Sequence, residues 1–293
     1  MTEPGVLALE ALGLVFVVGS MVAMGLSLSP QEIGHALRRW KVLLAVIAGN
    51  FLVVPAVTFG LTLLIPLPAD AKTGFLVLAF AAGAPFLPKL AQFARGSLSF
   101  AVGLMLVLMV LTVLTLPFIL PALAAGAYVS AWSVAQPLIL LMLVPMGVAF
   151  VIRTRIGGWA ERSVRVLNAT TTVSLFLFLI AFIAVFWNEI AATIGNSVFL
   201  FAFVFVLAAL GIGYLLGGGA AEVRRVASLG TAQRNVTAGI LVAVVCFPAS
   251  PLVLVTVLTT EIVGLVVLTV CSNLWGRRSA SGARTSTPPG AET

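Results

Sequence analysis

Charged side chains are scarce in this chain. Only 9% of its 293 residues are Asp, Glu, Lys or Arg, whereas 61% are hydrophobic. Soluble globular domains carry roughly a quarter charged residues, so water cannot be the main solvent of this protein. Apolar runs recur along the whole length and leave no stretch for a separate soluble domain. The composition predicts one membrane domain over residues 1–275.

Residues able to carry catalysis are also few. His35 is the only histidine, and the two cysteines, Cys246 and Cys271, stand in apolar runs without metal-ligand or redox spacing. The sequence has no HExxH pair, no membrane Asp pair and no Ser with a His partner. We therefore predict no enzymatic activity, no cofactor and no metal site. A channel would show a filter motif or a ring of charge, and neither is present.

Long apolar segments are what the sequence has in abundance. The hydrocarbon core of a bilayer is about 30 Å thick and a helix rises about 1.5 Å per residue, so a span needs about 20 apolar residues. In lipid the backbone must satisfy its own hydrogen bonds, which makes these segments helices. The sequence predicts an all-α integral membrane protein with about nine transmembrane helices, over 6–28, 42–65, 73–93, 98–123, 134–152, 168–187, 198–217, 226–247 and 252–275.

The basic residues follow an alternating pattern in the loops between these segments. Thirteen fall in alternate connections and in the tail, and only Lys72 falls on the opposite side. Cytoplasmic loops carry the excess of Lys and Arg, so topology explains the net charge of +7 without a nucleic-acid partner. The pattern predicts an outside N-terminus, a cytoplasmic C-terminus and a bacterial inner (plasma) membrane. Residues 276–293, rich in Ser, Thr, Pro and Gly, are expected to form a disordered cytoplasmic tail.

Two segments depart from plain apolar helices. The third reads GFLVLAFAAGAPFLPKLAQFARG, in which Pro85 and Pro88 remove N–H groups and disfavour helical geometry. The eighth reads VASLGTAQRNVTAGILVAVV, in which we expect Gly230 to interrupt the helix. Each lies between two plain spans, and the two trios have opposite predicted topology. This layout predicts an inverted repeat whose discontinuous helices cross near the midplane, where transporters bind substrate.

Polar residues at these breaks are the candidate site. A cation in the bilayer centre costs about 3 kcal/mol or more, so Lys89 and Arg234 need a counter-charge, a carbonyl cluster or a water-filled cavity; alternatively, either one snorkels to an interface. Hydroxyl and amide groups line a cavity or join helices by hydrogen bonds. The predicted substrate-binding residues are Lys89, Gln92, Thr231, Gln233, Arg234, Asn235 and Asn50, and Asn168, Thr170, Thr171 and Thr172 could line the same cavity.

Glu261 is the only carboxylate well inside an apolar run. It is either a fixed counter-ion to Lys89 or Arg234, or a site that couples transport to a proton or cation. The sequence leaves both roles open. Na⁺ and H⁺ are the possible coupling ions.

Three stretches resemble the bile acid:sodium symporter family. They are MGLSLSPQEIGHALRRWKVLL, GAPFLPKLAQFARGSLSFAVGL and GTAQRNVTAGILVAV, and the resemblance extends to about Trp275. It implies the nine-helix form of that fold, with a mobile core domain (42–123 and 198–275) and a panel domain (6–28, 134–152 and 168–187). Substrate would sit between the two, and a rocking of one against the other would give alternating access.

The chain departs from the sodium-coupled members at both breaks. Where those resemble G-G-T-A-S-N, with Ser and Asn as sodium ligands, residues 83–88 read GAPFLP. Where those resemble E-T-G-M-Q-N, the acidic position falls on Gly230 or Leu229, which cannot neutralise a cation. We expect Lys89 and Arg234 to occupy the space of the two sodium ions, so that sodium dependence is lost.

The predicted function is secondary active transport of a small organic anion, of the bile-acid or another carboxylate or sulfonate type with an apolar body, by alternating access. Arg234 and Lys89 would attract its charge; if Glu261 partly neutralises both cations, a zwitterion or neutral solute becomes possible. The guanidinium group of Arg suits a planar carboxylate because two of its N–H groups can bind both carboxylate oxygens. Two other interpretations stay open. A membrane sensor would bind the ligand without flux, and a membrane enzyme would depend on Glu261. The expected partners are the organic anion and the lipid bilayer, and the sequence does not predict an oligomeric state.

Overall fold

The computed structural model describes residues 3–28, 30–123, 130–188, 191 and 197–285 and is all-helical over them. Seven helices in these residues are long and apolar enough to cross a membrane. Two of the nine predicted spans are not among these seven. The first lies in the helix Glu3–Ser27, and the part of it whose side chains the structure describes is an apolar helix over Ala11–Ser27. The third is divided into two shorter helices.

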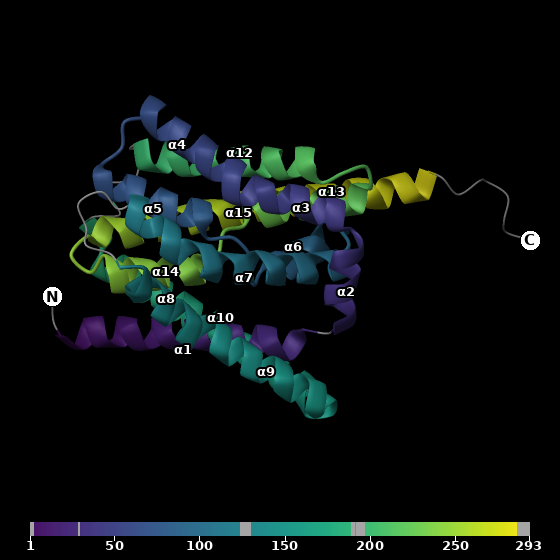
Figure 1. Ribbon diagram of the computed structural model, residues 1–293, viewed down its shortest axis with the longest axis horizontal. Helices are drawn as coiled ribbons and strands as arrows, with labels where there is room; N and C mark the ends of the chain where they lie inside the picture. The colour runs from purple at the N-terminus through teal and green to yellow at the C-terminus, as the bar shows by residue number, and fades with distance from the viewer. Residues whose placement is uncertain (1–2, 29, 124–129, 189–190, 192–196, 286–293) are drawn as a thin grey trace, which may run out of the picture.

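The helices follow one another with short connections, as Figure 1 shows. The first half of the chain contains α1 (Glu3–Ser27), α2 (Pro30–Arg38), α3 (Trp40–Ala48), η1 (Gly49–Val53), α4 (Val54–Leu64), α5 (Ala69–Phe80), α6 (Leu87–Phe93) and α7 (Leu98–Leu123). The second half contains α8 (Ala131–Leu138), η2 (Ile139–Leu143), α9 (Val144–Arg155), α10 (Gly157–Val185), α12 (Ser197–Leu216), α13 (Ala221–Ala232), α14 (Val236–Cys246) and α15 (Pro251–Thr285).

Two spans contain a wider, π-helical turn, and each such turn stands just before a proline. The turn η1 precedes Pro55, and η2 precedes Pro145. Proline lacks an N–H and its ring clashes with the carbonyl four residues earlier, and a π turn removes that clash without ending the helix. Trp40–Leu64 and Ala131–Arg155 therefore remain continuous spans.

The helices pack in two groups. In one group α1 lies against α9 and α10. In the other, α5, α7, α12, α13, α14 and α15 pack closely together, and α8 lies against α7 and α14, where the groups meet. Figure 1 shows α1 and α9 along the lower edge, beneath this larger group. Close approach within the smaller group depends on Gly25, because a Cβ there would collide with the carbonyl oxygen of Met146.

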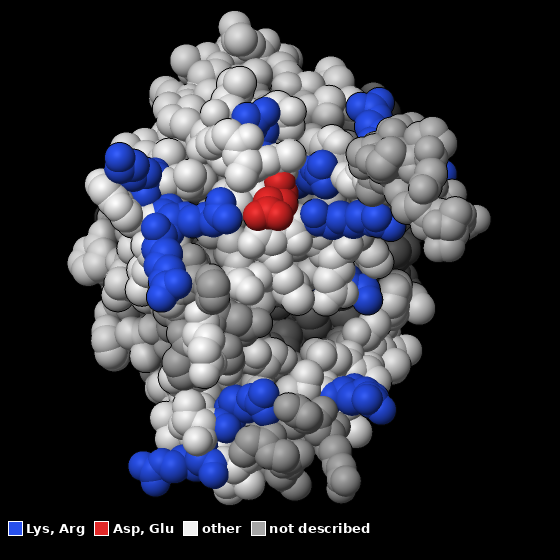
Figure 2. Space-filling view, turned by 90° about the vertical axis from the view of Figure 1, so that its right-hand side faces the viewer, with Lys and Arg blue, Asp and Glu red and all other residues white. Residues whose placement is uncertain are grey.

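Basic side chains gather at one end of the helices. Figure 2 shows this end, where blue side chains far outnumber red ones. Arg39 Nη2 lies 3.5 Å from Glu222 Oε1, and Arg225 Nη1 donates to the carbonyl of Ala94 at 2.9 Å, so the ends of α2, α6 and α13 meet here. A one-sided distribution of this kind is typical of a protein with a cytoplasmic face.

The last helix is longer than the sequence suggests. α15 continues past Trp275 to Thr285, so the first part of the predicted tail is helical. Residues 286–293 lie outside the described residues.

Candidate functional site

The first break in the fold separates α5 from α6. Helix α5 ends at Phe80 and α6 begins at Leu87, with Pro85 between them and Pro88 in the first turn of α6. The freed backbone is satisfied by Thr112 of α7, whose hydroxyl accepts from the Ala82 N–H at 2.8 Å. The same hydroxyl lies 3.0 Å from the Ala82 carbonyl, to which it can donate. A neighbouring helix thus replaces the hydrogen bonds that the helix itself has lost.

Gly83 fixes the path of the chain through this break. Its φ is +80°, a conformation that L side chains rarely adopt, and a Cβ would meet the backbone of Met105 and Met109. The two prolines indicate the break in the sequence. The need for glycine at this position is a consequence of the close approach of α7.

The second break lies between α13 and α14, and it falls later than Gly230. Gly230 is helical, and α13 continues to Ala232. The residues outside helical structure are Gln233, Arg234 and Asn235. The prediction that Gly230 interrupts the helix is therefore wrong. Its lack of a side chain serves packing instead, because a Cβ there would lie 2.9 Å from Leu87 and 3.0 Å from Leu104.

Asn235 joins the two breaks. Its backbone N–H donates to the Ala81 carbonyl at 2.8 Å, and its side-chain Nδ2 donates to the Gly83 carbonyl at 3.1 Å. Its Oδ1 accepts from the Ala238 N–H at 3.1 Å, which caps the N-terminus of α14. One buried side chain thus starts a helix and fixes the position of the other break. We call this meeting of residues 81–83 and 233–235 the junction.

Arg234 is the most enclosed charge at the junction, with only 2% of its surface exposed. Its Nε donates to the Leu78 carbonyl at 2.8 Å, and its Nη2 donates to the Ala79 carbonyl at 2.6 Å. Its Nη1 donates to Asn50 Oδ1 at 2.7 Å and to the Thr231 carbonyl at 2.8 Å. Four of the five guanidinium N–H donors are therefore occupied by oxygen atoms of the protein itself.

Asn50 and Thr231 complete this network. Asn50 lies in η1, is fully buried, and donates from Nδ2 to the Val46 carbonyl at 2.9 Å and to Thr231 Oγ1 at 3.2 Å. The structure thus brings three of the predicted residues, Asn50, Thr231 and Arg234, into one hydrogen-bonded cluster. This cluster ties the second span to α13.

Gln233 and Glu261 form a second polar contact beside the junction. Gln233 Nε2 donates to Glu261 Oε1 at 2.9 Å, from the second break to the first half of α15. Among the residues that the structure describes, no cation lies within ion-pair distance of Glu261. Gln233 Oε1 and Thr237 Oγ1 are buried there without a hydrogen-bond partner. The structure does not bring Glu261 to Lys89 or Arg234 as a counter-ion.

Lys89 and Gln92 lie away from this network. Both side chains are exposed, and the Lys89 Nζ stands 5.2 Å from the centre of the Phe93 ring. Residues three apart share a face of a helix, and the opposite face of α6, with Leu90 and Ala91, is the buried one. The break therefore turns Lys89 away from Arg234.

The polar run of the sixth span has a local role. Thr170 and Thr172 are exposed, whereas Thr171 is buried and its hydroxyl donates to the Asn168 carbonyl at 3.2 Å. Ser174 Oγ donates to the Leu12 carbonyl at 2.8 Å and joins α10 to α1. Only the Ser174 bond joins two helices, because the hydroxyls of Thr170, Thr171 and Thr172 bond to carbonyls of their own helix. Ser174 and Thr112 make contacts between segments that the sequence did not single out, because many similar hydroxyls in apolar runs only bond their own helix.

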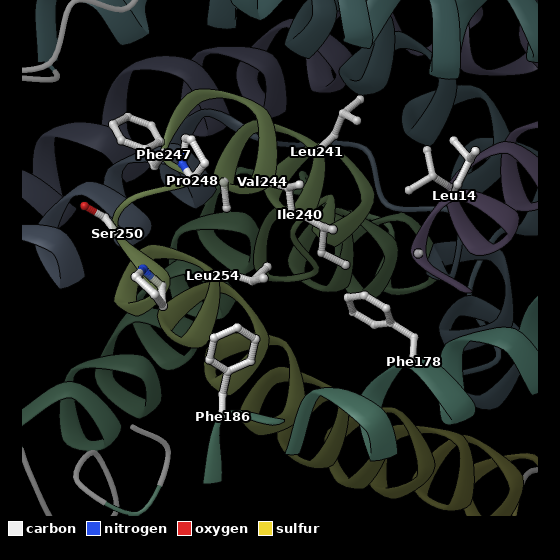
Figure 3. Close-up of a pocket in the computed structure, with 14 residues that line it drawn as sticks. Leu14, Phe178, Phe186, Ile240, Leu241, Val244, Phe247, Pro248, Ser250 and Leu254 are labelled. Atoms are coloured by element: carbon white, nitrogen blue, oxygen red, sulfur yellow. The ribbon is translucent and has the colours of Figure 1, made fainter. Parts of the chain in front are cut away.

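A cavity of about 370 Å³ lies between the two groups of helices. Figure 3 shows Leu14 and Phe178 on one side of it and Ile240 and Leu254 on the other. Ile240 stands one turn after the second break. The cavity is lined almost entirely by apolar side chains, from α1 (Gly13, Leu14, Val17), α10 (Phe178, Phe186), α14 and the following turn (Ile240, Leu241, Ala243, Val244, Phe247, Pro248, Ser250) and α15 (Pro251, Leu254).

The chain matches the model of a known protein family. The family model of the sodium bile acid symporter family matches residues 11–196, which is more than half of the 293-residue chain. No curated protein matches the chain. The matched range contains the first break and ends before the second. The members of this family are membrane transporters, which agrees with the apolar helices and supports a function other than catalysis. The chain belongs to the sodium bile acid symporter family.

Proposed function

We propose that the protein is a secondary transporter of a small organic anion that carries an apolar body. The observation that carries this proposal is the apolar cavity between the two groups of helices, one turn away from the second break. An apolar, concave site with a few polar groups at its edge suits a solute with a hydrophobic body. Transporters place such sites where broken helices meet.

We further propose that the two groups of helices are a panel (6–28, 134–152 and 168–187) and a core (42–123 and 198–275). Contacts of α1 with α9 and α10, and of α5 with α7, α14 and α15, support this division. Counting α1 as one span and α5 with α6 as another gives nine spans. The core then contains an inverted repeat in which α5–α6 and α13–α14 are the crossing helices. Rocking of the panel against the core would expose the cavity to each side in turn.

The anionic group would lie at the edge of the cavity, near the first turn of α14. Free N–H groups and the positive end of the helix dipole favour an anion at a helix N-terminus. Arg234 is buried and four of its five donors are occupied by oxygen atoms of the protein, so the helix N-terminus and not this guanidinium would meet the anion. Lys89 and Gln92 are exposed on α6 and do not line the cavity.

Uptake into proteoliposomes tests the proposal. The probe solutes are a bile acid, an aromatic carboxylate and an alkyl sulfonate. We expect saturable uptake of at least one of them by the native protein. The variant Ile240→Trp puts a larger side chain into the cavity and takes up space that the solute would use, so solute affinity should fall roughly tenfold, which corresponds to about 1.4 kcal/mol of binding free energy. The control is Leu215→Trp, at a site of which 83% is exposed outside the cavity.

Two results would contradict this proposal. Binding of a probe without flux would favour the sensor instead. Equal uptake by the Ile240→Trp variant and the native protein would show that the solute does not use this cavity.

We also propose an orientation with the basic end in the cytoplasm of a bacterial cell and the N-terminus outside. The one-sided charge in Figure 2 supports it. Protease accessibility of tags placed at the two termini, measured in inside-out and right-side-out vesicles, tests this orientation. Cleavage of both tags from the same side would contradict it.

A further inference from the structure

Within the part of the chain that the structure describes, the charge of Arg234 has no anionic partner. All of its acceptors are neutral, namely three backbone carbonyls and the amide oxygen of Asn50. Among the described residues no carboxylate forms an ion pair with it, and Glu261 bonds to Gln233 instead. A buried charge with no counter-charge is costly in a membrane unless polar groups surround it. The oxygen atoms at the junction therefore act as its solvation shell.

Two of these oxygens belong to the last turn of α5. Leu78 and Ala79 stand just before its end at Phe80, and the carbonyls at a helix C-terminus carry the partial negative charge of the helix dipole. The Thr231 carbonyl is at the end of α13, one residue before its last. Arg234 thus lies where the C-terminal ends of two interrupted helices converge. A convergence of carbonyl oxygens is the arrangement that proteins use to bind hard inorganic cations.

We propose that Arg234 is the resident cation of the junction. The guanidinium occupies a site built for a positive charge and holds the two breaks together, so the junction assembles without a free inorganic cation. The organic solute does not use this charge. The consequence for transport, which rests on the proposed function, is that uptake does not require sodium at this site.

This proposal differs from the expectation that Lys89 and Arg234 replace two cations together. Lys89 is exposed and has no carbonyl cage among the described contacts. Only the site at the end of α5 contains a tethered cation. The protein therefore has one such cation site, and the group that binds there is a guanidinium.

Thermal unfolding of the purified protein tests the inference without any transport measurement. The variant Arg234→Ala empties the cage, and ethylguanidinium, which has the shape of the missing part of the side chain, is the probe. We expect the melting temperature of Arg234→Ala to fall by on the order of 5 °C. Millimolar ethylguanidinium should restore most of the loss in a saturable way, and it should leave the native protein unchanged.

The matched control is Arg224→Ala. Arg224 also donates to backbone carbonyls, those of Gly218 and Gly219, but its bonds are exposed. Its loss should change the melting temperature little, and ethylguanidinium should have no effect on this variant. Sodium chloride and choline chloride should give the native protein the same melting temperature.

Several results would overturn the inference. They are an unchanged melting temperature in Arg234→Ala, equal rescue of Arg224→Ala, or a native protein that sodium stabilises and choline does not. If Arg234→Ala does not fold, Arg234→Lys provides the test, because a retained positive charge should keep the protein folded at a lowered melting temperature. An Arg234→Lys variant that also fails to fold, while Arg234→Gln folds, would contradict a role for the charge.

Discussion

The two breaks of this protein are made by different means. Proline creates the first, where Pro85 and Pro88 prevent a continuous helix and Thr112 of a neighbouring helix satisfies the exposed backbone. The second contains no proline. It is made by polar side chains, since Asn235 caps α14 and Arg234 bonds to the end of α5. The backbone hydrogen bonds of the first break thus come from a neighbouring helix. The side chains of the second break make hydrogen bonds both within that break and to the first one.

The strongest test of this difference is Gly83→Ala in the first break. A side chain there must adopt a φ of +80° and meet the backbone of Met109, which cannot move without shifting α7. Such strain costs about 1–3 kcal/mol, and the backbone clash adds to it. We expect the largest loss of stability here, measured by unfolding in mixed detergent and SDS micelles. The control is Gly211→Ala, where nothing lies within 4 Å of the added atom. Equal stability of the two variants would contradict a tight first break.

The second-largest loss of stability is expected for Asn235→Ala in the second break. It removes the cap of α14 and the bond from Nδ2 to Gly83 and leaves buried groups without partners. A lost cap costs about 1 kcal/mol and a buried hydrogen bond in a membrane costs about as much again, so a loss of roughly 2 kcal/mol is expected. Asn273→Ala is the matched control, because Asn273 is exposed and bonds only within its own helix. If both variants lost the same stability, Asn235 would not join the breaks.

A smaller effect is expected for Thr112→Val, which keeps the shape and removes the hydroxyl. The Ala82 N–H loses its acceptor, and the expected loss is about 1 kcal/mol. Thr115→Val is the comparison, since the Thr115 hydroxyl bonds only to Leu111 in its own helix. Hydrogen exchange of the Ala82 amide should rise in the first variant only. Unchanged exchange would show that Thr112 does not repair the break.

Of these variants, Glu261→Gln should have the smallest effect on stability and the largest effect on the coupling of transport to protons. The amide keeps a hydrogen-bonding group opposite Gln233 but cannot take up or release a proton. If Glu261 couples transport to protons, an imposed pH gradient will stimulate uptake by the native protein and leave uptake by the variant unchanged. Equal stimulation of both proteins would remove Glu261 from coupling.

Local signals in the sequence predicted part of this fold. Apolar length predicted the seven helices that are long and apolar enough to cross a membrane, and Pro85 and Pro88 located the first break to within a turn. The second break was placed too early, at Gly230, because a glycine inside a helix is tolerated when neighbouring side chains such as Leu87 pack against it. Asn235 is a favoured N-cap residue and was the better signal for the start of α14.

The partners of the charged residues could not be predicted in the same way. Lys89 and Arg234 occupy similar places in the two segments, yet one is exposed and the other is buried. Which of them meets carbonyl oxygens depends on where the end of α5 lies relative to α13, and that is set by packing of helices far apart in the sequence. The role of Thr112 could not be predicted for the same reason. In the sequence it resembles Thr115, and only the packing of α7 against the first break distinguishes the two residues.

The junction contains its own cation, and transport is therefore expected not to need sodium. Solute flux measured with and without sodium is the most direct test of this expectation. Proteoliposomes containing the native protein would be loaded with an organic anion, and exchange with labelled solute outside would be followed in sodium and in choline buffers. Saturable exchange that is equal in the two buffers is the predicted result. Exchange that stops when choline replaces sodium would contradict it.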